Sequence, residues 1–275
     1  MTRIQLIYAN YGCADEIQRS IGSIAHAGAS VYLDIVVVEN GGDRLERSKV
    51  ELPGGCALRI LSPGKNVGYF GALTEAITAP LDESGYDFRI LCNPDVKFED
   101  PSFFSRLASL SLEKSVAILA PTITSGISGT DQNPYLTSRP SAGLLRRWRL
   151  MYYSWASYAL YQLLSNARLR ILGVSSVRST LPAEQVKIYA PHGAFIIFAN
   201  QFLEEARDLE RIPFLFAEEL FLGEICHRSN RIVLYRPDLR VRHIEHATTT
   251  RIGTFRKFRM HKDALGSFLA YINSA

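Results

Sequence analysis

The sequence predicts an α/β fold in which helices flank a central, mostly parallel sheet. Over the first 120 residues, short apolar segments alternate with segments in which apolar residues recur at helical spacing. The short segments are continuous apolar runs rather than alternating ones, which is typical of strands that are covered on both faces. In such a doubly wound fold, ligands bind beyond the carboxyl ends of the strands.

The first half of the chain supplies strands and helices in alternation. Strands are predicted at residues 4–9, 33–40, 57–61, 88–92 and 116–120. Asp15 is expected to cap the first helix, because Ile17 and Ile21 then fall on one face. Further helices are predicted at residues 68–77 and from Asp100 onward.

The second half is expected to complete the same domain. The predicted elements are strands within 185–200, helices near 201–209 and 216–228, two short strands within 231–246, and a last helix at about 255–273. No internal repeat or low-complexity linker separates the two halves. We therefore expect one α/β domain built from residues 1–130 and 184–275, interrupted by an insert at 131–183.

The composition is that of a globular protein without a membrane span. Of the 275 residues, 47% are hydrophobic and 21% are charged, and no apolar run approaches the ~18 residues of a spanning helix. The N-terminal segment enters a strand-like run without the features of a signal peptide. The four cysteines form no C-x-x-C pair. These features predict a cytoplasmic protein with reduced thiols.

The insert is basic and aromatic. From Gln132 to Ala183 it has no acidic residue, and it carries seven arginines: Arg139, Arg146, Arg147, Arg149, Arg168, Arg170 and Arg178. Aromatic and aliphatic side chains fill the space between them, as in RRWRLMYYSWASYALYQLL. We expect residues 139–178 to form a helical flap that meets the anionic inner face of a membrane as a peripheral contact. A hairpin packed on the domain and a homodimer contact remain alternatives.

Residues 251–262 form a second basic segment. Two basic segments are a feature of nucleic-acid-binding proteins, so this class has to be considered. The net charge is only +4, however, and the arginines of the insert lie in an aromatic segment with a helical pattern. A nucleic-acid partner is therefore not expected.

Polar residues follow the strands of the first half at the points where they end. They are Asn10, Glu39 with Asn40, Asn66 with Gly68, and Asp95 after Asn93 and Pro94. Turns favour such residues in any protein, so each one alone has a structural explanation. Together they bring carboxylates and amides to one rim of a parallel sheet, where such folds bind ligands. The segment NVGYFG precedes a helix and suits a diphosphate, although it matches neither a P-loop nor G-x-G-x-x-G.

Seven motifs occur in the order seen in a known enzyme family. They are LIYANYG, IVVVENGG, NVGYFGALTEAI, ILCNPDV, IYAPHGAFIIF, FLFAEELFLGEICHRSNRIVLYRPDLRV and HIEHATT. In them the chain resembles the family 2 glycosyltransferases of the GT-A fold, most of all the rhamnosyltransferase-like branch of bacterial surface-polysaccharide biosynthesis. The resemblance covers nearly the whole chain except the insert. It implies that residues 1–130 bind a nucleotide sugar and that residues 184–275 bind the acceptor and carry the catalytic group.

The resemblance assigns a metal site to the NPD segment. Asp95 stands at the D-x-D-type metal motif of the family, with Asn93 in place of the first acid. A single carboxylate suits Mg²⁺ or Mn²⁺, which keep waters and substrate phosphates as ligands. His243 matches the strand-end histidine of the family and is a further expected metal ligand, with His246 as the alternative. A capping acid and hydrogen-bonded structural histidines are the other interpretations.

The same resemblance places the donor along the strand tips. Glu39 stands where the family reads the imide N–H of uracil or thymine, although the usual residue there is Asp. Asn66 and Gly68 match an N-x-G segment beside the nucleotide and sugar, and Asn10 and Asn93 complete the predicted donor site. The implied donor is a UDP- or dTDP-sugar. A solvated strand-end acid and an ordinary turn are the structural alternatives for these positions.

The resemblance assigns catalysis to the segment FAEELFLGEIC. Its second acid, Glu219, matches the general base of the family, and Glu218 is the alternative. Adjacent residues of a helix point about 100° apart, so only one of the two is expected to face the site. The base takes the proton of the acceptor hydroxyl while the oxygen attacks the anomeric carbon, which inverts the configuration. His192 and Gly193 are expected on the acceptor side, where glycine permits a close approach.

The sequence thus predicts an inverting glycosyltransferase that acts on a glycan or a polyprenyl-diphosphate-linked acceptor in surface-polysaccharide synthesis. A sugar nucleotidyltransferase would carry a glycine-rich, basic loop after the first strand, and ANYGCADEI is not such a loop. A non-catalytic subunit that binds sugar nucleotides or polysaccharide remains open, because Asn93 and Glu39 depart from the residues of the family.

Overall fold

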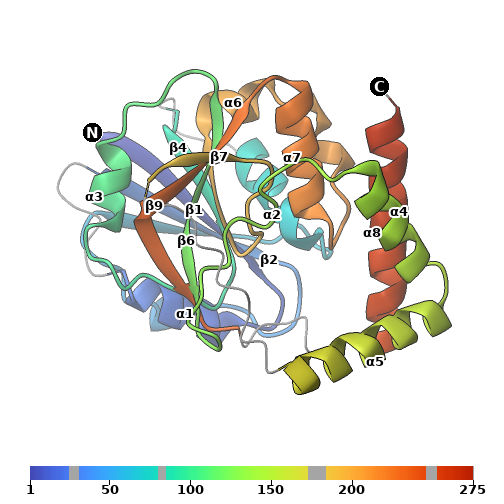
Figure 1. Cartoon of the computed structure of the whole chain (residues 1–275). Coiled ribbons are helices and arrows are strands. Elements are labelled where there is room, and N and C mark those ends of the chain that lie inside the picture. The colour runs from blue at the N-terminus through green and yellow to red at the C-terminus, as the bar shows by residue number, and fades with distance from the viewer. Residues whose placement is uncertain (25–30, 80–84, 173–183, 246–252, 275) are drawn as a thin grey trace.

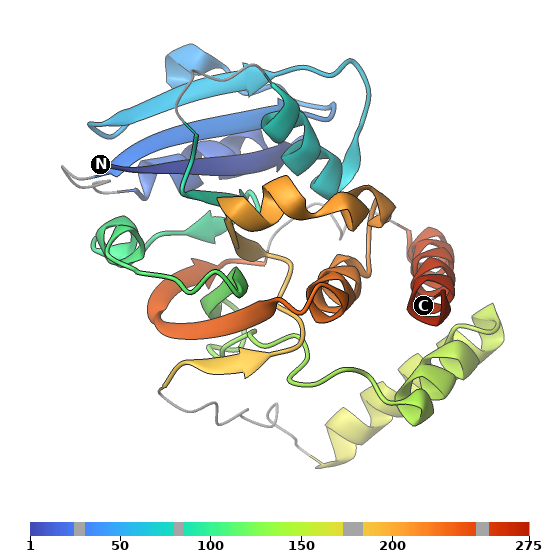
Figure 2. The same ribbon diagram turned by 90° about the horizontal axis from the view of Figure 1, so that it is seen from above.

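The computed structural model describes residues 1–24, 31–79, 85–172, 184–245 and 253–274. Within these ranges, nine strands form one sheet with helices on both faces (Figure 1 and Figure 2). The predicted fold class, an α/β domain with a central sheet flanked by helices, is confirmed.

The elements follow one another as the sequence pattern indicates, with small shifts at their ends. The strands are β1 (Thr2–Asn10), β2 (Val31–Glu39), β3 (Cys56–Leu61), β4 (Phe88–Cys92), β5 (Val96–Lys97), β6 (Val116–Ser125), β7 (Val186–Ile188), β8 (Phe195–Ala199) and β9 (Ile232–His243). The helices are α1 (Ala14–Gly22), α2 (Gly68–Thr78), α3 (Phe103–Ala108), α4 (Ala142–Met151), α5 (Trp155–Leu172), α6 (Asn200–Glu205), α7 (Glu218–Arg228) and α8 (Thr254–Asn273). Two 3₁₀ turns, η1 (Arg47–Lys49) and η2 (Arg207–Arg211), complete the described elements.

The strands lie in the order β3-β2-β1-β4-β8-β6-β9-β5, and β7 pairs with β9. The first four are parallel, as predicted, and β6 is parallel to β9. In contrast, β8 is antiparallel to β4 and β6, and β5 and β7 are antiparallel to β9. The sheet is therefore mixed beyond β4. A continuous apolar run indicates that both faces of a strand are covered, but not in which direction the strand runs.

β9 is one bent strand rather than the two short strands that the sequence predicts. Its register against β6 shifts where Pro121 pairs with Arg236 and the next residue, Thr122, pairs with Arg240. Residues 237–239 are left out of the ladder, beginning with a proline that has no N–H to donate. The curved strand in Figure 2 then reaches β5, where His243 pairs with Val96. The bend thus carries the end of β9 to the segment that follows β4.

Two predicted helix starts are displaced by one to three residues. α1 begins at Ala14 with Cys13 as its N-cap, so Asp15 lies in the first turn, where a carboxylate favours the helix dipole. α3 begins at Phe103, and Asp100 accepts the N–H of the capping residue Ser102. Both acids act near the helix start, but neither is the cap itself.

The core lies on both faces of the sheet, as the apolar runs predict. Leu6 and Tyr8 of β1 point to the α1 and α3 side and are fully buried. Ile7 points to the opposite side, where it joins a cluster that includes Phe221 of α7 and Phe268 of α8. This packing makes the parallel half a rigid support for the loops at its carboxyl rim.

Two helices make up most of the described part of the insert, after a non-helical segment at residues 131–141. Its helices are α4 and α5, and Figure 1 and Figure 2 show α5 projecting from the body of the domain beside α8. Arg178, a member of the predicted flap, lies outside the described residues. Among the described helices, none has the length and apolar character that a bilayer-crossing helix needs.

Candidate active site

A cavity of about 920 Å³ lies at the carboxyl rim of the parallel strands. The loops after β1, β2 and β4, the starts of α2, α7 and α8, and the end of β9 contribute to its lining. Nine residues predicted from the sequence lie in it: Asn66, Gly68, Asn93, Asp95, His192, Gly193, Glu218, Glu219 and His243. The alternative histidine, His246, lies outside the described residues.

Asp95 and His243 form a nearly buried pair in this cavity. Asp95 Oδ1 lies 3.2 Å from His243 Nε2. His243 Nδ1 lies 2.9 Å from Gln132 Oε1, and because that oxygen can only accept, Nδ1 carries the proton. In the neutral ring, the lone pair of Nε2 then points towards the Asp95 carboxylate. The Asn93 amide nitrogen lies 3.4 Å from His243 Nε2.

This donor set fits a hard divalent cation. Two electron-pair donors that face each other over 3.2 Å are held by a cation or a proton between them. A carboxylate oxygen and an imidazole nitrogen both bind Mn²⁺, and a carboxylate suits Mg²⁺. No group of three or more His, Cys, Asp or Glu side chains forms a metal site within the described ranges. Asp95 and His243 would therefore share the ion with water and substrate oxygens.

The described lining of the cavity carries more acidic than basic groups. The carboxylates are those of Asp95, Glu218, Glu219 and Glu245, and the guanidinium is that of Arg256. An excess of carboxylates repels an anionic ligand. A divalent cation held by Asp95 and His243 would offset this negative charge, and Arg256 would add to its effect.

An unusual turn directs two glutamates into the cavity. Phe216 and Ala217, which precede α7, have φ angles of 70° and 63°. For residues with a Cβ this left-handed region costs roughly 1–2 kcal/mol each. The Phe216 ring stacks on His261 of α8 with centroids 3.8 Å apart, which supports the turn. Both Glu218 and Glu219 then line the cavity, so the expectation that only one of them faces it is wrong.

Glu219 approaches the backbone of Gly193. The Gly193 N–H donates to Glu219 Oε1 over 3.1 Å, and a Cβ at Gly193 would lie 2.6 Å from that oxygen. The glycine therefore permits the Glu219 carboxylate to approach the backbone closely. Burial raises the pKa of Glu219, and burial together with the neighbouring Glu219 raises the pKa of Glu218 to about 8. The cavity thus holds one carboxyl group with a pKa of about 8 and a second whose pKa is raised by burial, and a raised pKa suits a general base.

His192 presents a neutral ring beside the same glycine. The Ala194 N–H lies 3.2 Å from His192 Nδ1, so Nδ1 accepts and Nε2 carries the proton. Burial lowers the pKa of His192 to about 4, which keeps the ring uncharged at neutral pH. Tyr69 donates its hydroxyl to the Gly193 carbonyl over 2.8 Å. These groups give the cavity hydrogen-bonding side chains next to Glu219.

Two predicted donor ligands, Asn10 and Glu39, do not line the cavity. Both are buried, and Asn10 Nδ2 donates to Glu39 Oε2 over 2.9 Å. Glu39 Oε1 accepts the Leu45 N–H, also over 2.9 Å, so the pair ties together the loops after β1 and β2. Asn40 lines the cavity in place of Glu39, and its Nδ2 donates to the Gly68 carbonyl. That Glu39 reads a nucleotide base stays a prediction.

Other lining residues were not singled out from the sequence. They include Tyr11, Tyr69, Gln132, Phe214, Glu245, Arg256 and Met260. Of these residues, Arg256 could have been suspected from the sequence, because it belongs to the basic segment 251–262. No sequence pattern indicates Gln132, because its contact with His243 joins positions 111 residues apart.

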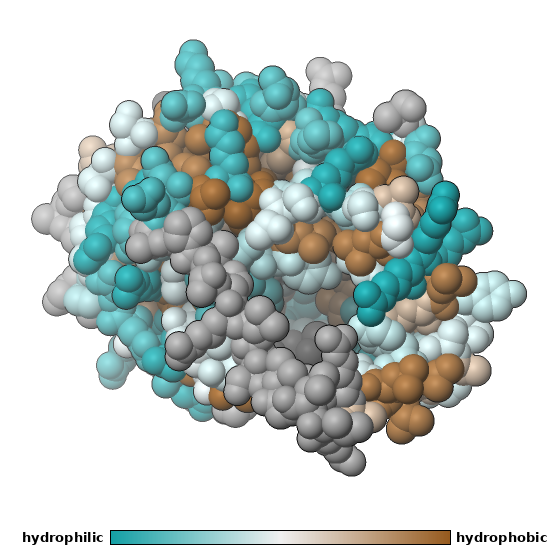
Figure 3. Space-filling model, in the orientation of Figure 1, coloured by the Kyte–Doolittle hydropathy of each residue, from teal (hydrophilic) through white to brown (hydrophobic). Residues whose placement is uncertain are grey.

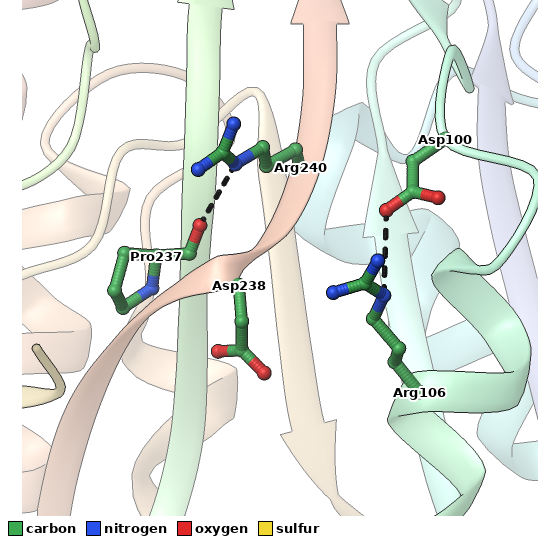
Figure 4. Close-up of a pocket in the computed structure, with 5 residues that line it drawn as sticks. All are labelled: Asp100, Arg106, Pro237, Asp238 and Arg240. Carbon is green, nitrogen blue, oxygen red and sulfur yellow. Dashed lines mark hydrogen bonds and ion pairs between the residues drawn. The ribbon is translucent and has the colours of Figure 1, made fainter. Parts of the chain in front are cut away.

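A second, smaller cavity of about 390 Å³ is lined by residues near the start of α3 and at the bend of β9 (Figure 4). Arg106 pairs with Asp100 over 3.6 Å, and Arg240 Nε donates to the Pro237 carbonyl over 3.1 Å. Asp238 is paired in turn with Arg236. Charges of both signs neutralise one another here, and the predicted site residues all lie elsewhere.

Neither a family model nor a curated protein matches the chain in sequence. Solved structures resemble it in fold. GalNAc-T7 with UDP, GalNAc and Mn²⁺ superposes with a TM-score of 0.59 at 14% identity, over 89% of this chain and 44% of that one. This chain thus spans less than half of the length of GalNAc-T7.

Two further structures are similar over the whole chain. The mannosyltransferase PcManGT from Pyrobaculum calidifontis, in complex with GDP-Man and Mn²⁺, gives a TM-score of 0.53 at 12% identity, over 99% of this chain and 74% of that one. S. aureus TarS 1-349 in complex with UDP-GlcNAc gives a TM-score of 0.55 at 12% identity, over 100% of this chain and 67% of that one. At these identities the likeness establishes the fold, and the fold is the GT-A fold of glycosyltransferases.

Proposed function

We propose that the chain is a glycosyltransferase that moves a sugar from a nucleotide-sugar donor to an acceptor hydroxyl, with inversion at the anomeric carbon. The observation that carries the proposal is the content of one cavity: the pair Asp95–His243 and the uncompensated carboxyls Glu218 and Glu219. The nucleotide sugars bound by PcManGT and TarS, and the UDP and GalNAc in GalNAc-T7, support a donor of this class.

The donor is a UDP- or dTDP-sugar whose diphosphate lies near Asp95. Asp95 and His243 would hold Mg²⁺ or Mn²⁺, and the Mn²⁺ in GalNAc-T7 and PcManGT supports this assignment. When bound, the ion stabilises the charge that develops on the departing diphosphate. Arg256 faces the same cavity and adds a positive charge beside the leaving group. Asn66, Gly68 and Asn93 are proposed to contact the nucleotide sugar.

Glu219 is the proposed general base. Its carboxylate accepts the proton of the acceptor hydroxyl as the oxygen attacks the anomeric carbon. The bond between that carbon and the diphosphate oxygen breaks in the same step, and the nucleoside diphosphate leaves with the electron pair. A single displacement from the face opposite the leaving group inverts the configuration. The Gly193 N–H holds one Glu219 oxygen in place, so that the other oxygen remains available for the proton.

The acceptor is proposed to bind beside His192 and Gly193, and to be a glycan or a lipid-linked glycan of a surface polysaccharide. His192 is a neutral ring that carries a proton on Nε2, which suits a hydrogen bond to a sugar hydroxyl. The seven motifs, which resemble those of the rhamnosyltransferase-like branch, support this class of acceptor. The scattered cysteines, which form no C-x-x-C pair, support a cytoplasmic site of action.

Nucleotide binding and turnover test the proposal separately. Thermal unfolding is followed with UDP, dTDP and GDP, each with and without Mn²⁺, and a rise in Tm that needs both nucleotide and metal is expected. Release of nucleoside diphosphate is then measured with the matching nucleotide sugars and a panel of octyl glycosides as acceptors. Nucleotide binding without any release, even from donor hydrolysis, would instead indicate a non-catalytic sugar-nucleotide-binding subunit.

A further inference from the structure

The insert and α8 expose an unusual amount of apolar surface. Of the thirteen large hydrophobic side chains that are exposed within the described ranges, eight lie on α4, on α5, between them, or at the start of α8. The most exposed are Leu150, Tyr153, Leu160, Leu163 and Leu164, with 56–75% of their surface open to solvent. In Figure 3 the apolar side chains gather at the lower right, where Figure 1 places α5. We refer to this surface as the α5 face.

α5 lacks the polar outer side of an ordinary surface helix. From Trp155 to Leu164 only Tyr158 is buried, so apolar residues point in nearly all directions. No charged residue occurs from Trp155 to Ala167. A helix of this kind is stable when an apolar medium covers it.

The charges around the α5 face are mostly positive, although Asp263 is exposed next to Lys262 on α8. Arg146, Arg147 and Arg149 are exposed on α4, and no acidic residue occurs from Gln132 to Ala183. Arg259 and Lys262 are exposed on the adjoining α8. Apolar side chains bordered by cations are complementary to a bilayer with anionic headgroups.

The same charges disfavour a second copy of the chain as the covering partner. A two-fold contact between α5 faces would bring the arginines of both copies together without a carboxylate from either insert. The aromatic residues Tyr153, Trp155 and Tyr161 also suit a boundary between water and hydrocarbon, because each combines an apolar ring with a polar group.

We propose that the α5 face docks the protein on an anionic lipid bilayer, with α5 lying in the plane of the headgroups. The face adjoins the cavity through α8. Phe255 of α8 contacts Trp155 of α5 with ring centroids 5.5 Å apart, and Arg256 and Met260 of the same helix line the cavity. Docking would present the cavity to an acceptor held at the bilayer, and this consequence rests on the proposed function. The docking itself does not depend on that function.

Co-sedimentation with lipid vesicles tests the docking. Vesicles that contain about one third phosphatidylglycerol should pellet the wild-type protein at low salt and release it at high salt, whereas pure phosphatidylcholine vesicles should bind it far less. The triple variant Arg146→Glu, Arg147→Glu, Arg149→Glu should bind the anionic vesicles more than about 100-fold more weakly. A charge-matched control replaces Arg19, Arg47 and Arg211 with Glu. These arginines are exposed on α1, η1 and η2, and the control should lose much less binding.

An apolar variant separates insertion from simple charge attraction. Leu163→Glu places a carboxylate on the α5 face and should weaken binding at least about tenfold. Ile127→Glu is its matched control, since Ile127 is 74% exposed but lies in the loop after β6. Equal losses in Leu163→Glu and Ile127→Glu would overturn the proposal, because the face would then act only through net charge.

Tryptophan fluorescence reports on the depth of α5. The chain has two tryptophans, so Trp148→Phe leaves Trp155 as the only one. Its emission should shift to shorter wavelength and lose access to iodide when anionic vesicles are added. Unchanged emission in a protein that still pellets would show that another surface binds, which overturns the assignment.

The remaining outcomes distinguish docking from dimerisation and from catalysis. A wild-type protein that stays in the supernatant and runs as a dimer, which Leu163→Glu converts to a monomer, would make the α5 face an interface between copies. Donor hydrolysis is measured in parallel without vesicles, and the triple variant should retain it. Vesicle binding without hydrolysis would refute the proposed function alone, and hydrolysis without vesicle binding would refute the docking alone.

Discussion

The two ends of α7 bury carboxylates in opposite ways. Near its end, Glu224 is fully buried, and its oxygens accept hydrogen bonds from Arg139, Arg228 and Tyr189. Burial acts to raise the pKa of Glu224, but the bonds from these three partners lower it overall. At the start of the helix, Glu218 and Glu219 meet no cationic side chain among the described residues, and their pKa values are raised.

The difference separates a structural acid from candidate catalytic ones. A buried carboxylate with matched cations holds α7 to the neighbouring elements and remains ionised. A buried carboxylate without them is costly to ionise, and the fold retains two such groups at a strained turn beside a cavity. Uncompensated burial of this kind is common at functional sites, because proton transfer needs a pKa near the working pH.

The largest effect is expected from a fourth buried carboxylate, Asp95, which pairs with His243. Asp95→Ala should reduce transfer by on the order of 10³–10⁴-fold, because the several kcal/mol that a metal contributes to the leaving group are lost. It should also remove the increase in nucleotide affinity that Mn²⁺ causes. Calorimetric titration of UDP and dTDP with and without Mn²⁺ measures this, and unchanged affinity would refute the assignment.

Glu219→Gln should reduce turnover by about 10²–10⁴-fold, the range typical for loss of a general base. The amide keeps the shape and the hydrogen bond from Gly193 but accepts no proton, so donor affinity should be unchanged. Steady-state kinetics and donor titration check both expectations. Glu218→Gln is the matched control, and a larger loss in that variant would move the base by one residue.

Gly193→Ala tests whether the position of Glu219 matters apart from its chemistry. The new Cβ would lie 2.6 Å from Glu219 Oε1 and would displace the carboxylate. A shift of about 1 Å at a reacting group can reduce the rate by about 10²-fold. We expect kcat to fall while donor affinity is retained. Gly266→Ala, at a helical glycine with open space around it, should have no such effect.

Glu224→Gln should act on stability and not on chemistry. The substitution weakens the bonds to Arg139 and Arg228, which are partly exposed, and should reduce the free energy of unfolding by about 2 kcal/mol. Denaturant unfolding measures this change. Turnover per folded molecule should be unchanged, and a hundredfold loss of turnover with normal stability would contradict the division between the two ends of α7.

The pH dependence of stability should show the smallest effect when it is measured per pH unit, with opposite signs for the two ends of α7. The pKa of Glu218 is raised from 4.5 to about 8, so its contribution to stability is fully present below pH 4.5 and is lost as pH rises to about 8. The pKa of Glu224 is lowered, so its contribution is present above its ordinary pKa and is lost as pH falls. Between pH 5 and 8, Glu218→Gln should reduce the decline of stability by up to about 1.4 kcal/mol per pH unit.

Much of the fold was predictable because its signals are local. Apolar runs identified β1, β2 and β4 to within a few residues, and the end of each strand indicated a polar rim. The motif order placed Asp95, Glu219 and His243 among the site residues, and the cavity contains all three. Burial on both faces, turn chemistry and motif order can all be read from neighbouring residues.

Only the tertiary structure decided which polar groups meet. It turned Asn10 and Glu39 towards each other within the rim and put Asn40 at the cavity in their place. It brought Gln132 to His243, so that the protonated nitrogen points away from Asp95. These contacts join distant positions of the chain, and no local pattern encodes them.

The exposure of α5 was likewise settled by packing. The sequence determined that the insert is basic, aromatic and helical in pattern, and left open whether it packs on the domain. In the folded chain only Tyr158 of its first ten residues is buried, and the leucines face solvent. An apolar periodicity shows that a helix needs a partner, but the partner is determined by which surfaces the rest of the chain leaves free.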